Sequence, residues 1–166
     1  RCARRCPGDH HSVKQAGPRA LAFCDKPQGA TKVALIFGAD PGLVSTSADT
    51  LARNWLPSPD PFNIIKLHDD DLKRDPQMLG DELVARSLMG GDRLIRVRVE
   101  KDASSKHLLE ILADIDKGAL TLEAFLIIEA GELNKTNRLR LGFEESKSAI
   151  ALQLYADDEA TVSDLV

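Results

Sequence analysis

The sequence predicts an α/β domain in which a parallel five-stranded sheet is flanked by helices. Two observations carry this prediction. Several short apolar runs show no alternation with polar residues, which is typical of strands buried on both faces of a sheet. Segments whose apolar residues recur at helical spacing separate these runs, and strands that alternate with helices favour parallel pairing.

The overall composition restricts the class of protein. The chain has 166 residues, and its 43% hydrophobic and 29% charged residues are ordinary for a soluble globular domain. The net charge of −4 argues against a protein that reads DNA sequence through a broad basic surface. No run approaches the roughly 18 apolar residues of a membrane span, so we expect no membrane association. Three cysteines, in neither an even set nor a CxxC motif, favour a reducing, cytoplasmic location.

Residues 1–19 are expected to form a poorly ordered lead-in, because they contain proline, glycine and little apolar material. Cys2, Cys6, His10 and His11 are ligand types that zinc prefers, but their spacing matches no established zinc finger. We therefore expect no metal site there. Since the chain has no initiator methionine, we expect its start to be processed, excised or incompletely recorded.

The first expected strand covers residues 33–37 and ends at Gly38. Asp40 is a suitable helix N-cap, and Pro41 suits the first helical position, where a missing N–H costs nothing. Apolar residues then recur at helical spacing as far as Trp55. A buried strand, a glycine turn and a helix form the local architecture of a phosphate-binding loop.

This loop lacks the residues that act on phosphate. A working phosphate-binding loop needs a lysine to meet the phosphates and a hydroxyl to hold magnesium. Gly38 and Gly42 are only four positions apart, and Leu43 and Val44 stand where the lysine and the hydroxyl are expected. We therefore predict a degenerate phosphate loop at Gly38, Asp40 and Gly42, with no bound cofactor, no metal and no catalytic residue.

The remaining elements follow in order. Asp75 and Pro76 repeat the capping signal and predict a helix to about Arg86, whereas the acidic run at residues 68–71 indicates a solvated loop rather than a metal site. In the strand expected after that helix, at 93–99, arginines alternate with apolar residues, which indicates a strand end, a sheet edge or a partner on that face; a solvated strand end is the usual explanation. The other expected strands cover residues 62–67, 93–99, 124–129 and 149–154. Two more helices are expected to start at Ser104 or Ser105 and at Asn137. Active nucleotidases of this architecture hold magnesium with a pair of acidic residues at the end of the fourth strand. In this chain Glu129 is the only acidic residue at that place, which argues against a hydrolase.

Four segments, in this order and spacing, resemble the delta subunit of bacterial DNA polymerase III. They are residues 36–44 (IFGADPGLV), 87–89 (SLM), 125–135 (FLIIEAGELNK) and 155–159 (YADDE). The resemblance runs from about residue 30 to the end of the chain. It implies an AAA+-like member of the P-loop NTPase class with a degenerate nucleotide site, over residues 20–154. It also implies that residues 155–166 begin a second, helical domain that is truncated here.

The resemblance implies a non-catalytic clamp-loader subunit of the replicative holoenzyme, which is a nucleotidyltransferase complex. Such a subunit binds the sliding clamp (the beta subunit) and helps to open it for loading on primed DNA. Its expected partners are the clamp, the other clamp-loader subunits and primed DNA within the assembled complex. It does not itself hydrolyse ATP.

The resemblance also implies that Ser87, Leu88 and Met89 bind the clamp, because delta subunits use an apolar plug at this position. The family typically carries phenylalanine where this chain carries Met89. Helical spacing places Leu88 and Met89 off the buried stripe that Leu79 and Leu83 define. The alternative is that both side chains belong to the core at the helix end.

Two other functions stay open on the sequence alone. A nucleotide-binding P-loop-type enzyme with an atypical phosphate loop would need another cation, and Lys32 is the nearest. Lys32 precedes the first strand, so we expect it at the opposite end of the sheet from the loop. A signalling receiver domain would need acidic residues at the end of the first strand, where Phe37 and Gly38 stand.

Overall fold

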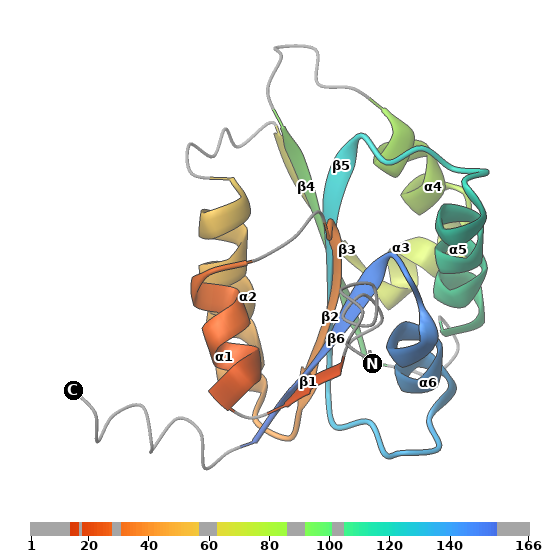
Figure 1. Cartoon of the computed structure of the whole chain (residues 1–166). Helices are drawn as coiled ribbons and strands as arrows, with labels where there is room; N and C mark the ends of the chain where they lie inside the picture. Colours follow the sequence, from red (N-terminus) through yellow and green to blue (C-terminus); the bar gives the residue numbers. More distant parts are fainter. Residues whose placement is uncertain are drawn as a thin grey trace, which may run out of the picture.

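The computed structural model describes residues 14–16, 18–27, 31–56, 63–85, 92–100 and 105–155. These residues form one parallel six-stranded sheet in the order β1-β6-β2-β5-β4-β3 (Figure 1). The strands are β1 (Lys14–Ala16), β2 (Val33–Gly38), β3 (Ile64–His68), β4 (Arg93–Val99), β5 (Ala124–Ala130) and β6 (Ala149–Leu154). The helices are α1 (Pro18–Asp25), α2 (Pro41–Trp55), α3 (Asp69–Arg74), α4 (Met78–Val84), α5 (Ser105–Lys117) and α6 (Arg138–Glu145).

Helices cover both faces of the sheet, as predicted. Figure 1 shows α1 and α2 on one face and α3, α4, α5 and α6 on the other. Side chains of β2 illustrate the division: Leu35 packs in the core on the α5 side, and Ile36 packs in the core on the α2 side. All six residues of β2 are buried, which explains why the strand shows no polar alternation.

The five predicted strands are confirmed, and a sixth strand joins them. β1 pairs with β6 through Lys14 to Ala16. The expectation of a poorly ordered lead-in was therefore wrong for residues 14–16, and also for residues 18–19, which begin α1. Three residues without apolar patterning carry no strand signal; they form a strand because β6 offers an open edge of backbone donors and acceptors.

The region after β3 also differs from the expectation. The acidic run is not a loop, because α3 begins at Asp69, and a second helix, α4, begins at Met78. Asp71 explains the early start: its side chain accepts a hydrogen bond from the backbone N–H of His68 at 3.0 Å and pairs with Arg74 at 2.9 Å. Three acidic residues in the first helical turn also suit the positive end of the helix dipole.

The described ranges contain neither a candidate membrane span nor a candidate metal site. In those ranges no helix has the length and apolar character needed to cross a bilayer. Within the same ranges no three His, Cys, Asp or Glu side chains gather as a group that could hold a metal ion. Cys2, Cys6, His10 and His11 lie outside the described residues.

Candidate functional site

The loop between β2 and α2 is capped as the sequence predicted. Oδ1 of Asp40 accepts hydrogen bonds from the backbone N–H of Gly42 at 2.9 Å and of Leu43 at 3.2 Å. Pro41 occupies the start of α2. In a phosphate-binding loop, the N–H groups at this helix end point at the phosphate. Here the Asp40 carboxylate takes two of them.

Gly38 has a structural role in the sheet. A Cβ atom at this position would lie 2.6 Å from the carbonyl oxygen of Leu154 in β6. Real Cβ atoms essentially never approach another atom so closely, and the obstacle is backbone rather than a flexible side chain. The close approach of two strands therefore requires glycine here, whether or not a phosphate binds.

Glu129, the single acidic residue at the end of β5, belongs to a chain of three charged side chains. Oε2 of Glu129 accepts from Nε of Arg96 at 2.7 Å, and Nη1 of Arg96 donates to Oδ1 of Asp49 at 2.5 Å. Arg96 and Glu129 are both close to fully buried. Burial lowers the pKa of Arg96, but the bonds to Asp49 and Glu129 outweigh burial and raise it above the ordinary value. Arg96 thus neutralises Glu129 inside the protein.

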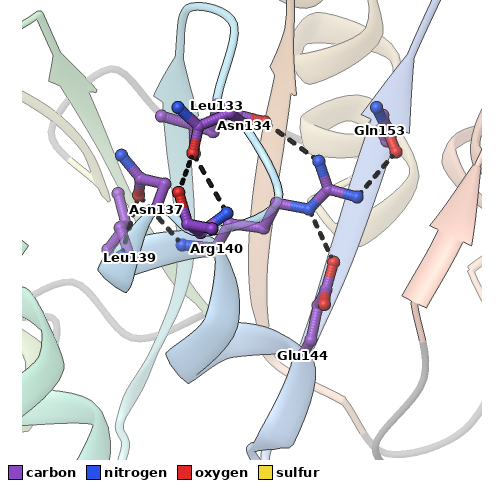
Figure 2. Close-up of polar contacts among 8 residues, drawn as sticks. Leu133, Asn134, Asn137, Leu139, Arg140, Glu144 and Gln153 are labelled. Carbon is purple, nitrogen blue, oxygen red and sulfur yellow. Dashed lines mark hydrogen bonds and ion pairs between the residues drawn. The ribbon is translucent and has the colours of Figure 1, made fainter.

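A second buried arginine lies near the carboxyl ends of β2 and β6. Figure 2 shows the Arg140 guanidinium directed toward three groups: the carbonyl of Leu133 at 2.9 Å, Oε2 of Glu144 at 2.8 Å and Oε1 of Gln153 at 3.2 Å. Its Cζ also lies 5.1 Å from the centre of the Phe37 ring. Arg140 therefore ties α6 and the segment after β5 to β2 and β6.

A third buried arginine, Arg93, holds the end of α4. Its Nη1 donates to the carbonyls of Glu82 at 2.6 Å and Ala85 at 2.9 Å, and its Nη2 pairs with Oε1 of Glu82 at 2.5 Å. The last carbonyls of a helix have no partner within the helix, so Arg93 supplies one. The segment 86–91 connects Ala85 to this part of β4, and the two ends of that segment are joined through Arg93.

Ser87, Leu88 and Met89 lie in that segment and outside the described residues, so their role stays a prediction. The structure does describe the helix before them. Leu79 and Leu83 are fully buried, as predicted for the core stripe, whereas Val84 is 44% exposed.

Sequence reasoning missed the role of the arginines in β4. The usual explanation, a solvated strand end, holds for Arg98 but is wrong for Arg93 and Arg96, whose side chains are only 8% and 12% exposed. The missed signal was Glu129, an equally isolated charge in an apolar strand. An acidic and a basic residue that each interrupt an apolar strand are candidates for a buried ion pair with one another.

Lys32, the cation that a nucleotide-binding enzyme would need, lies at the amino end of β2. Its Nζ is 5.7 Å from the centre of the Phe125 ring. The six residues of β2 separate it from the β2–α2 loop by roughly 20 Å at 3.3 Å per residue. Lys32 does not reach a phosphate in that loop.

Comparisons with known proteins identify the fold. No protein-family model matches the sequence, and no curated protein matches it. Among solved structures, the DNA clamp loader delta protein of Bacillus subtilis matches with a TM-score of 0.57 and 14% identity. The match covers 82% of this chain and 41% of the delta protein, so the chain spans less than half of that protein's length. A DNA polymerase III gamma subunit-related protein of Thermotoga maritima matches with a TM-score of 0.49 and 12% identity, over 87% of this chain and 48% of its own. The match to the delta protein shows a shared fold: the chain has the fold of the matched part of that protein.

Proposed function

We propose that this chain is the clamp-binding part of a clamp-loader subunit that neither binds nor hydrolyses ATP. The fold of the delta protein carries the first half of the proposal, and the Asp40 cap supports the second. In this role the chain would act in the cytoplasm with the other clamp-loader subunits, and would help to open the sliding clamp for loading on primed DNA.

The argument against ATP rests on charge. A phosphate at the N-terminus of α2 would meet the Asp40 carboxylate, which already accepts from two of the N–H groups. Two like charges 4 Å apart repel by about 4 kcal/mol at an effective dielectric constant near 20. The lysine that would offset this repulsion in a phosphate-binding loop is missing, because Leu43 and Val44 stand in its region.

The clamp contact is proposed at Ser87, Leu88 and Met89. These residues follow α4 directly, and Arg93 fixes the place where the chain leaves that helix. Leucine and methionine side chains each contribute about 1.5–3 kcal/mol when they are fully buried from water.

The test is a titration of this chain with purified sliding clamp. Replacing Leu88 and Met89 together by alanine should weaken binding by about two orders of magnitude or more, since 1.4 kcal/mol corresponds to tenfold. Leu141→Ala is the matched control, because Leu141 is an exposed leucine of α6, 39% accessible, and its loss should leave clamp affinity unchanged. Thermal melting of the same variants separates binding from folding.

The opposite pattern would refute the assignment. If Leu88 and Met89 belong to the core, their truncation costs about 2–5 kcal/mol each in stability and leaves the affinity of the folded fraction unaltered. Met89→Phe provides a second check, because it installs the residue typical of delta subunits and should bind the clamp at least as tightly as the starting chain.

A further inference from the structure

The two sides of the described sheet end in different ways. β3 forms one edge, and its Lys66 and His68 are exposed. Charged and polar side chains on an edge strand discourage pairing with another chain, because such pairing would crowd them and remove them from water. On the other side, β6 is the last long strand, and in the described residues the short strand β1 covers it (Figure 1).

β6 has the composition of a strand that pairs readily with other chains. Its six residues, AIALQL, include no charged residue, no proline and no glycine. Short uncharged segments of this kind associate edge to edge when they are exposed. The protection that Lys66 and His68 give to β3 is therefore missing from β6, and its edge depends on being covered.

β1 is a small cover for this edge. It pairs in register with Ala151, Leu152 and Gln153, the middle of β6. Three residues contribute few backbone hydrogen bonds, and pairing this short is too weak to persist in water by itself. Something else must keep β1 beside β6.

The helix that follows, α1, holds β1 in place. It begins at Pro18, two positions after the end of β1. Ala20 and Cys24 of α1 are buried in the core on the α2 side. At the end of α1, Nδ2 of Asn54 donates to the carbonyl oxygens of Cys24 at 2.6 Å and Asp25 at 2.9 Å. An anchored helix therefore tethers β1 to the edge of β6.

We infer that β1 shields the edge of β6 from a second copy of this chain, and that two copies pair through β6 when β1 is released. A short tether gives β1 an effective concentration at the edge on the order of millimolar, so a second copy at micromolar concentration does not displace it. The occupant is a second copy because β6 is self-complementary. A two-fold axis between two molecules places their β6 strands antiparallel, and each strand supplies the backbone partners that the other lacks.

The test removes backbone donors from β1 in the full chain. Neighbouring residues of a strand direct their N–H groups to opposite sides, so Lys14→Pro combined with Gln15→Pro removes a donor on the β6 side whichever residue faces it. Lys14→Ala combined with Gln15→Ala is the matched control, since it changes the same side chains and keeps both N–H groups. A milder variant replaces residues 14–16 by glycine, which weakens the strand without removing a donor.

Sedimentation velocity over a range of concentrations measures the association, with a reducing agent present so that disulfides of Cys2 or Cys6 do not join copies. We expect the starting chain and the alanine control to stay monomeric. The proline variant should approach twice the monomer mass, with an apparent dissociation constant lower than that of the starting chain by about tenfold or more. The glycine variant should lie between them.

Hydrogen exchange measured by NMR locates the contact. The β6 amides that face the edge should lose protection in the dilute proline variant and regain it in concentrated samples. Urea titration reports whether each variant is folded, and the glycine variant decides the matter if the proline variant is not.

Four results would overturn the inference. One is a folded variant that stays monomeric although the edge amides of β6 exchange freely. Another is association that leaves these amides unprotected, because the copies then meet at a different surface. Equal association of the alanine control would assign the effect to side chains rather than to pairing. A starting chain that dimerises as readily as the proline variant would show that β1 shields nothing.

Discussion

Arg93 offers the sharpest test of how α4 is held. Its side chain is 8% exposed and donates to the carbonyls of Glu82 and Ala85 as well as to the Glu82 carboxylate. Replacing it with methionine keeps much of the volume and removes every donor. The two carbonyls at the end of α4 then lose their partner, and the Glu82 carboxylate loses its counter-charge.

The expected cost is about 3 kcal/mol. Breaking a buried ion pair by removing one partner costs about 3–5 kcal/mol. The lower end applies because the Glu82 side chain is 35% exposed and water can hydrate the carboxylate that remains. For a domain of this size, 1 kcal/mol shifts the melting temperature by about 2–4 °C, so Arg93→Met should melt about 6–12 °C lower.

Thermal melting and urea titration measure this loss, and Arg98→Met is the matched control. Arg98 lies in the same strand, but its side chain is 45% exposed and its nearest carboxylate, that of Glu100, is 3.9 Å away. The control should change stability by less than about 0.5 kcal/mol. If the two variants melt at the same temperature, Arg93 does not hold α4. Arg93→Lys should fall between them, because it keeps the charge and loses the fork.

Three further predictions concern Arg140, Cys24 and Asp40. Arg140→Met should destabilise the chain by about 3–5 kcal/mol in urea titration, since Glu144 loses its buried counter-charge; a loss below about 1 kcal/mol would contradict the network in Figure 2. Burial, with a smaller effect of Asp25, raises the pKa of the Cys24 thiol from 9.0 to about 12, so Cys24 should resist alkylation in the native Cys2→Ser, Cys6→Ser chain and react once urea unfolds it. A raised folded-state pKa stabilises the fold below the unfolded value, so this contribution to stability should be lost as pH rises from about 9 toward 12. Equilibrium titration with labelled ATP and magnesium should show no micromolar binding, and Asp40→Ala should cost about 1 kcal/mol of stability through the lost cap without creating such binding.

The elements that could be predicted from the sequence are those whose signal is local. Short runs rich in apolar residues identified the five strands, although arginines interrupt the run at 93–99. Asp40 with Pro41 identified the start of α2, because capping depends on residues within one turn. β1 could not be predicted, since its stability comes from the edge of β6, more than a hundred positions away in the chain.

The candidate site was less predictable for the same reason. Arg96 is 33 positions from Glu129 and 47 from Asp49, and only the order of strands brings the three together. The absence of the phosphate-binding lysine and hydroxyl from the β2–α2 loop could be predicted, because it is read directly from the sequence. The need for glycine at position 38 could not be predicted, because it comes from the backbone of Leu154, at the opposite end of the domain sequence.

The contact between Gly38 and Leu154 bears on how such a domain changes over evolutionary time. A lysine that serves only phosphate is free to drift once ATP is no longer used. Gly38 is constrained in a different way, because any larger residue would force β2 and β6 apart. A glycine at the end of β2 is therefore no sign of nucleotide binding by itself, because the sheet requires it whether or not a phosphate binds.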